Sequence, residues 1–129
     1  MKEFSIRTGH RTQFIEVSRE VQSAVTEMGV ADGVVTVFVP HTTAGVMINE
    51  HADPDVVEDV GRVLDRLAPW EDRTYRHAEG NTAAHVKAIM VGSSARVIVQ
   101  GGRLRLGTWQ GVFFCEFDGP RTRQVWVAT

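Results

Sequence analysis

The sequence predicts a compact, single α+β domain that spans residues 1–129 and is built on a largely antiparallel sheet with about three helices. Apolar, β-branched runs typical of strands occur near both ends of the chain, and helical patterns cluster between them. The elements do not alternate strand and helix as they do in a doubly wound fold. An apolar fraction of 43% and a charged fraction of 23% are those of a globular chain long enough for one domain.

The N-terminal segment predicts two strands and a short helix. The runs EFSIRT (3–8) and QFIEVS (13–18) favour an opening strand pair joined by the turn GHR. A helix is expected over residues 19–28, with Ser18 as its N-cap and Gly29 as the residue that ends it.

The middle of the chain contains two further strands and two helices. GVVTVFV (33–39) is apolar on both faces, which indicates a central strand, and AGVMIN (44–49) is the next strand along the chain. In the following helix, Asp53 suits the N-cap, and the proline after it suits the first turn. A last helix is expected after Asn81 or Thr82, in TAAHVKAIMVG.

Four strands are expected in the C-terminal third. ARVIVQ (95–100) turns at a Gly-Gly pair into RLRLG (103–107), which is a strong hairpin signal. WQGVFFCEF (109–117) is expected to turn at DGPR into TRQVWVA (122–128).

Charge and cysteine content exclude several classes of protein. A net charge of −2 gives no general attraction to nucleic acid or to an anionic membrane. No apolar stretch approaches the length that spans a bilayer, and the N-terminus lacks the apolar core of a signal peptide. Cys115 is the single cysteine, and its apolar neighbours predict a buried thiol. We therefore expect a soluble, cytoplasmic protein.

Three histidines lie at the ends of predicted elements, where side chains from different parts of a fold converge. His41 follows a central strand, His77 lies in the loop YRHAEGN, and His85 lies in the first turns of a helix. Three neutral imidazoles can bind a divalent metal and leave a position open for water or substrate. Their spacing matches no compact metal motif such as HExxH, so ordinary histidines of turns or the core are the alternative.

Several other polar residues are candidates for acid–base or ligand roles. Glu50 and Glu79, together with Asp53 and Asp55, are candidate metal ligands, residues that orient ligands, or general bases. Glu50 is the favoured base, because a strand end is more rigid than the loop that contains Glu79.

A second unusual stretch is GRLRLGTWQG. Glycine within a strand pattern indicates a bulge or a close approach of two backbones. Trp109 and Gln110 follow directly, and they suit the wall of a site or a contact between subunits. A core tryptophan next to an ordinary turn is the alternative.

Three segments together resemble the YjbQ-like family, whose members are described as secondary thiamine-phosphate synthases. The segments are HTTAGVMINEHADPD, HAEGNTAAHVKAIMVGSS and GRLRLGTWQGVFFCEFDGPR, and the resemblance covers nearly the whole chain. It implies a compact α+β subunit that assembles as a homotrimer with sites near subunit interfaces. The positions that fall on the family pattern are His41, Asn49, Glu50, Asp53, His77, Glu79, Asn81, His85, Thr108, Trp109 and Gln110.

The resemblance implies a transferase that joins a pyrimidine-methyl pyrophosphate to a thiazole phosphate and releases pyrophosphate. Such a reaction needs cations on the departing pyrophosphate, usually Mg²⁺ with basic side chains, and a surface that holds two flat rings. The expected cofactor is a divalent metal, either Zn²⁺ or Mg²⁺. Trp109 is a candidate stacking surface, and the candidate phosphate partners are Lys87, Arg96, Arg103, Arg105, Arg121 and Arg123.

Two other functions remain open. One is a metal-dependent hydrolase, or another enzyme acting on a small molecule, with a site of His41, His77 and His85. The other is a non-catalytic, trimeric metal-binding protein. In the homotrimer we expect the C-terminal strands, VFFCEF and VWV, to take part in the subunit contacts, because both runs are rich in apolar residues.

Overall fold

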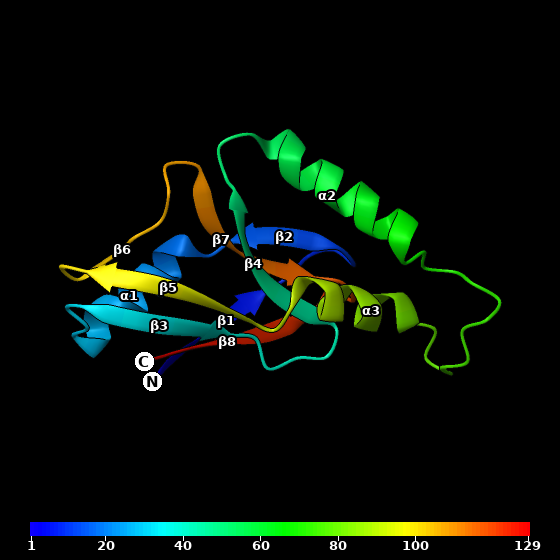
Figure 1. Cartoon of the computed structure of the whole chain (residues 1–129). Coiled ribbons are helices and arrows are strands. Elements are labelled where there is room, and N and C mark those ends of the chain that lie inside the picture. The colour runs from blue at the N-terminus through cyan, green and yellow to red at the C-terminus, as the bar shows by residue number, and fades with distance from the viewer.

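A computed structural model describes residues 1–129, and its elements form two antiparallel sheets and a helical layer (Figure 1). It confirms the predicted α+β class, with eight strands and three helices. In Figure 1 the larger sheet, with five strands, occupies the lower part of the molecule, and α2 lies on the opposite side. None of the helices has the length and apolar character needed to cross a membrane.

The larger sheet has five strands, and its centre is the apolar strand that the sequence predicted. Its spatial order is β1-β8-β3-β5-β6, and each neighbouring pair is antiparallel. The strands are β1 (Lys2–Arg7), β8 (Thr122–Ala128), β3 (Gly33–Phe38), β5 (Ser94–Gln100) and the short β6 (Arg103–Leu104).

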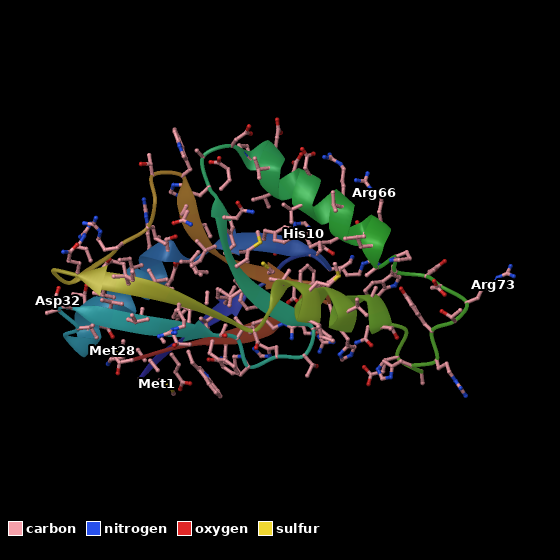
Figure 2. All side chains as sticks on the ribbon, in the orientation of Figure 1. Met1, His10, Met28, Asp32, Arg66 and Arg73 are labelled. Atoms are coloured by element: carbon pink, nitrogen blue, oxygen red, sulfur yellow. The ribbon has the colours of Figure 1, made fainter.

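The smaller sheet has three strands in the order β2-β7-β4. The strands are β2 (Gln13–Glu16), β7 (Gln110–Glu116) and β4 (Ala44–Glu50), and the helices are α1 (Ser18–Met28), α2 (Pro54–Leu67) and α3 (Thr82–Val91). Arg66 near the end of α2 and Arg73 in the loop after it extend outward from the molecule in Figure 2.

Strand β7 separates two apolar clusters, because alternate residues of a strand point to opposite faces. Val112 and Phe114 pack in the cluster between the two sheets, which also includes α1. Phe113 and Cys115 face the other way and pack with Leu64 of α2 and with α3. Both faces of the smaller sheet are therefore buried within one subunit.

The burial of β7 contradicts one expectation about assembly. Every residue of VFFCEF (112–117) is buried inside the subunit, so this run is unavailable for contact with another copy. Its apolar residues supply the two cores instead, and sequence alone could not distinguish these two uses.

The predicted N-terminal strand pair and the predicted turn at DGPR are both wrong as hairpins. β1 pairs with β8 in the larger sheet, whereas β2 pairs with β7 in the smaller one. β7 and β8 likewise belong to different sheets, as do β3 and β4. The chain crosses between sheets at these places, because each sheet needs the other to bury its apolar face.

The helix ends agree with the sequence at α2 but not at α1. The side chain of Asp53 accepts a hydrogen bond from the backbone N–H of Asp55, as expected for an N-cap before Pro54. Ser18 does not cap α1; its hydroxyl donates to Glu16 and accepts from the N–H of Val112. Ser18 therefore ties the helix to the smaller sheet.

Candidate functional site

Three of the loops that connect one sheet to the other meet at one end of the molecule. They join β1 to β2, β3 to β4 and β7 to β8. Register places the end of β1 beside the start of β8, with Arg7 opposite Thr122. The start of β4 lies beside the end of β7, with Ala44 opposite Glu116. The connecting loops thus converge there, and they bring together polar side chains from both sheets.

A buried ion pair joins the two sheets at this end. Glu116 of β7 is 0% exposed and Arg123 of β8 is 4% exposed. The Arg123 Nε donates to Glu116 Oε1 at 2.8 Å, and Arg123 also donates to Thr43 Oγ1 at 2.8 Å. Thr8 donates its hydroxyl to the same Glu116 oxygen at 2.8 Å. Burial alone would raise the pKa of Glu116, but the bonds from Arg123 and its neighbours hold that pKa below its usual value.

The same network fixes the loop after β7. The backbone N–H of Asp118 donates to Glu116 Oε2 at 3.0 Å. The Asp118 carboxylate accepts from Asn81 Nδ2 at 2.8 Å and from Arg121 at 3.0 Å. This chain of bonds connects the core ion pair to the start of α3, so these side chains are held in place before any ligand binds.

Asn81 has an oxygen atom that the protein does not use. The residue is 6% exposed, and its Oδ1 is buried without a hydrogen-bond partner. Although Asn81 is the N-cap residue of α3, its side chain makes no bond to the helix. A buried acceptor without a partner destabilises a fold by about 1–3 kcal/mol, so the presence of this unpaired oxygen requires an explanation.

A polar cavity of about 430 Å³ lies among these groups. We call it the histidine cavity. Its lining combines three imidazoles with charged and amide side chains: His41, His77, Glu79, Asn81, His85, Asp118, Arg121 and Arg123. The structure therefore brings together the three histidines, Glu79 and Asn81 that the sequence singled out.

His77 and His85 form the closest pair of imidazoles in the cavity. Their ring centroids are 5.6 Å apart, with one ring edge-on to the other. Two imidazoles on one zinc ion have centroids about 5 Å apart, given Zn–N bonds of about 2 Å. This pair has a spacing that suits a shared ligand.

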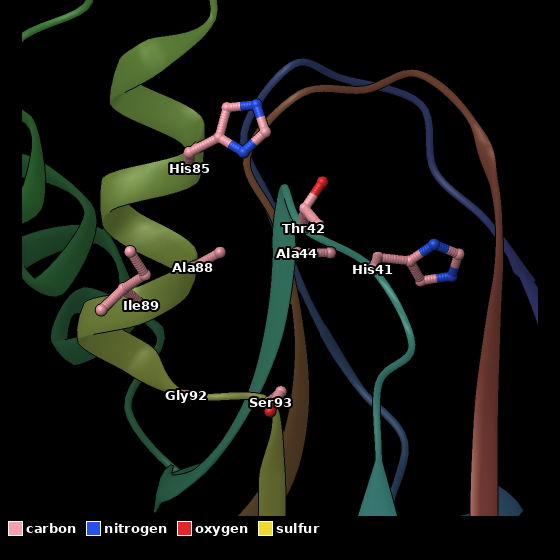
Figure 3. A pocket seen from close by; sticks show the side chains of 8 residues that line it. All are labelled: His41, Thr42, Ala44, His85, Ala88, Ile89, Gly92 and Ser93. Atoms are coloured by element: carbon pink, nitrogen blue, oxygen red, sulfur yellow. The ribbon is translucent and has the colours of Figure 1, made fainter.

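His41 lines the same cavity but points elsewhere. Its Nε2 accepts a hydrogen bond from the backbone N–H of Gln124 at 2.9 Å, and Figure 3 shows the ring turned away from His85. Burial and the positive charge of Arg123 lower the pKa of His41, so the neutral ring with a proton on Nδ1 is favoured. In this arrangement neither ring nitrogen offers a free lone pair.

The cavity contains no complete set of metal ligands as it stands. No three His, Cys, Asp or Glu side chains are arranged to hold a metal ion. A metal shared by His77 and His85 would therefore need a third ligand, obtained if His41 or Glu79 turns.

An apolar slot of about 350 Å³ adjoins the histidine cavity (Figure 3). His41, Thr42 and His85 line both spaces, and the slot continues over Ala44 and Ile89. Ile89 is 81% exposed, which is unusual for a large aliphatic side chain. The two spaces together suit a molecule with a polar part and an apolar part.

The remaining predicted site residues lie at the opposite end of the smaller sheet. Glu50 pairs with Gln110 at one end of the β4–β7 ladder, and Ala44 pairs with Glu116 at the other. Strand rise separates these ends by roughly 20 Å. In one subunit, therefore, Asn49, Glu50, Asp53, Thr108, Trp109 and Gln110 do not reach the histidine cavity.

Two of those residues, Glu50 and Asp53, line an acidic pocket of about 300 Å³ beside α2, together with Glu58. His51 lies in it, and its Nδ1 is 2.9 Å from a carboxylate oxygen of Glu16. The hydrogen bond to Glu16 raises the pKa of His51.

Gly111 in GTWQG makes this pair possible. A Cβ atom at Gly111 would lie 2.6 Å from the Glu16 carboxylate and 2.9 Å from the Cβ of His51. The crowding at this glycine comes from side chains and not from a second backbone, so the expected close approach of two backbones is not what is found here. Trp109 is 64% exposed, so the alternative of a core tryptophan is wrong.

Most candidate phosphate partners are occupied or lie elsewhere. Lys87 is buried and paired with Asp65. Arg123 is paired with Glu116, and Arg121 is paired with Asp118 at 3.0 Å. Arg96, Arg103 and Arg105 do not line the histidine cavity.

Sequence reasoning missed Glu116 and Asp118, which hold the cavity together. The available signal was a glutamate within the apolar run VFFCEF, because a charge in a buried strand needs a partner. The prediction for Cys115 is confirmed: the thiol is buried, and burial raises its pKa far above the usual range.

Comparison with known proteins identifies close relatives over the whole chain. The protein YugU of Bacillus subtilis, a UPF0047 protein, is 52% identical over 127 residues, which cover 98% of this chain and 96% of the relative. A UPF0047 protein of Methanocaldococcus jannaschii is 44% identical, over 96% of this chain and 89% of its own length.

Solved structures agree with this relationship. The crystal structure of an uncharacterised YjbQ/UPF0047 protein from Clostridium acetobutylicum has a TM-score of 0.96 and 51% identity, covering 99% of this chain and 98% of that one. A conserved hypothetical protein from Thermus thermophilus has a TM-score of 0.92 and 41% identity, with the same coverage. The family model described as "UPF0047 protein YjbQ-like" matches residues 2–129, and this chain therefore belongs to the YjbQ-like (UPF0047) family.

Proposed function

We propose that the protein is a cytoplasmic enzyme that acts on a small phosphorylated molecule in the histidine cavity, and that formation of thiamine phosphate is its reaction. The observation that carries this proposal is the junction of a polar cavity, which contains the half-exposed Arg121 and two neighbouring imidazoles, with an apolar slot. Such a junction suits a substrate with a flat ring and a phosphate-bearing arm.

Different residues would bind the phosphate, assist the leaving group and hold the ring. Arg121 is half exposed, so its guanidinium can donate to a phosphate oxygen while it remains near Asp118. Without a metal, the imidazoles of His77 and His85 would donate hydrogen bonds to the departing pyrophosphate. The slot beside Ala44 and Ile89 would hold a ring and exclude water from one of its faces.

A divalent metal fits part of this cavity. His77 and His85 would hold it, and a metal such as Zn²⁺ would supply the positive charge that the two paired arginines lack. Glu79 and His41 are the candidates for the remaining ligand position.

A metal-dependent hydrolase is the second candidate function. The spacing of His77 and His85 favours it, since two imidazoles and one carboxylate are a common ligand set in such enzymes. Glu79 would then be a ligand or a general base rather than a residue that orients substrate.

We also propose that the subunits form a homotrimer through the outer face of the larger sheet. Its face opposite the core carries Val34, Phe38, Ile98 and Trp126, and Ile98 is 61% exposed. The rings of Phe38 and Trp126 stack at 5.8 Å, and the buried Trp126 Nε1 has no partner. A second copy would cover this apolar face and supply an acceptor.

Assembly bears on function, because it decides which residues can meet at one site. A closed ring of three copies brings different surfaces together, so the Trp109 end of one subunit can approach a neighbour's histidine cavity. A trimer without catalytic activity, which holds a structural metal at the same histidines, is the remaining alternative.

The test compares His77→Ala and His85→Ala with the native protein, purified without an affinity tag. We measure bound metal by mass spectrometry and turnover of pyrimidine-methyl pyrophosphate with thiazole phosphate. We expect both variants to lose metal and turnover while they keep the native circular dichroism spectrum. A native protein that holds metal but turns over neither these substrates nor simple phosphate esters would refute both enzymatic proposals.

A further inference from the structure

Helix α2 carries more apolar surface than its own subunit covers. One stripe of the helix packs on the core through Val57 and Leu64. Beside it lies a second stripe, in which Val63 is 41% exposed and Leu67 is 63% exposed. A groove of about 330 Å³ follows this second stripe, and its lining is Val56, Asp59, Val60, Val63 and Leu64. An apolar face of this kind on a surface helix indicates contact with another molecule.

The second stripe has the spacing of a seam between paired helices. Its residues follow one another at intervals of four, three and four positions: Val56, Val60, Val63 and Leu67. These intervals are those of positions a and d in a heptad, which line up along one side of a helix and insert between the side chains of a facing helix. The face therefore fits a second helix.

The charges beside this seam identify the facing helix. On its outer side lie Asp59, in the acidic N-terminal half of α2, and Arg66, in the last turn. Arg66 extends outward (Figure 2), and Asp59 is paired only with the exposed Arg62, a contact that contributes little. In an antiparallel pair of helices these two flanking positions face each other across the seam. Asp59 of each copy would then meet Arg66 of the other, so the charges fit a second copy of α2.

We propose that two copies of this chain associate through α2, with the two helices antiparallel across a two-fold axis. Such a contact uses the same patch on both copies, so Val60 meets Val63 of the second copy and Val56 meets Leu67. Four apolar side chains from each copy form a small contact, since stable interfaces bury about 1,200–2,000 Å² in total. If the subunits also form the proposed homotrimer, three such contacts join two trimers at once and strengthen one another. The inference rests on the proposed function only for this count of six copies.

Analytical ultracentrifugation at micromolar concentration counts the copies. We expect two trimers joined as a hexamer for the native protein. We expect Val63→Glu to leave separate trimers, because it places an unpaired charge in the seam from both copies. Val63 is exposed within the subunit, so the variant should keep the native circular dichroism spectrum.

An exchange of charges tests the antiparallel orientation. Asp59→Arg should weaken the contact between trimers about tenfold, since two arginines then face each other at both ends of the seam. Asp59→Arg combined with Arg66→Asp should restore it, because opposite charges meet again. Glu58→Arg is the matched control: it reverses a neighbouring, exposed charge that lines the acidic pocket, and it should leave the hexamer intact.

Three results would overturn the inference. The first is a native protein with the same number of copies as Val63→Glu, in which case another kind of partner covers the seam. The second is a native trimer that Val63→Glu breaks into monomers, because the contact would then lack a two-fold axis. The third is a double exchange that binds no more tightly than Asp59→Arg alone. A native dimer that Val63→Glu converts to monomer would keep the inference and reject the homotrimer.

Discussion

Glu116 on β7 and Arg123 on β8 form an ion pair that joins the two sheets across the interior of the subunit. Each partner belongs to a different sheet, and both sheets end in loops at this place. The pair therefore acts as the structural base of the histidine cavity rather than as one of its free charges.

Removal of one partner of this pair should strongly destabilise the protein. We expect Arg123→Met to lower the free energy of unfolding by about 3–5 kcal/mol, because Glu116 is left as an uncompensated buried charge. Denaturant unfolding measures this. The double variant Glu116→Leu/Arg123→Met should recover most of the loss, and a double variant as unstable as the single one would contradict this explanation.

The same pair should make stability depend on acid pH. The pKa of Glu116 is lower in the folded protein than its ordinary value of 4.5, so its contribution to stability is present above that value. The contribution is lost as the pH falls through the folded pKa. The free energy of unfolding of the native protein should therefore decline more steeply below about pH 4.5 than that of Glu116→Gln. Equal slopes would count against the prediction.

His41 should resist protonation in the folded state. Burial and Arg123 lower its pKa below 6.5, so its contribution to stability is present above 6.5 and is lost as the pH falls toward the folded pKa. NMR titration of the imidazole should give a midpoint below 6.5, and nitrogen shifts should show Nδ1 protonated. A midpoint at or above 6.5 would mean that the bond from Gln124 does not persist in solution.

His51 should behave in the opposite way. The bond to Glu16 raises its pKa above 6.5, so its contribution to stability is present below 6.5 and is lost as the pH rises through the folded value. In Glu16→Gln the NMR midpoint of His51 should fall back toward 6.5. Glu58→Gln removes another carboxylate of the same pocket and should change this midpoint much less.

The N-cap of α2 should make a measurable contribution to stability. Asp53→Ala removes the acceptor for the N–H of Asp55, and we expect a loss of about 0.5–2 kcal/mol in the free energy of unfolding. Asp53→Ser keeps an acceptor and should lose much less. Similar losses in both variants would mean that the carboxylate acts in some way other than capping.

The outer face of the larger sheet should control the oligomeric state. Ile98→Glu places a charge in the proposed interface, where its burial would be unfavourable, so the assembly should shift toward monomer. Light scattering at micromolar concentration measures this. Glu58→Arg, on α2 at the opposite side of the molecule from the larger sheet, is the control. A native protein that is already monomeric would refute the assembly proposal.

The sequence by itself determined the class of fold and most element boundaries. Local signals suffice for these: Gly29 ends α1 in a left-handed conformation, and Asp53 with Pro54 begins α2. The apolar pattern of β3 correctly placed it in the middle of a sheet. Such features depend on residues near one another in the chain.

Only the tertiary structure decided how strands pair and which polar residues meet. A turn motif such as DGPR looks the same whether the chain returns in one sheet or crosses to another, and here it crosses because two sheets bury each other's apolar faces. That crossing places Glu116 against Arg123 and Asn81 against Asp118. It also places Glu50 and Trp109 far from the histidine cavity, since the two ends of the β4–β7 ladder cannot share a site within one subunit.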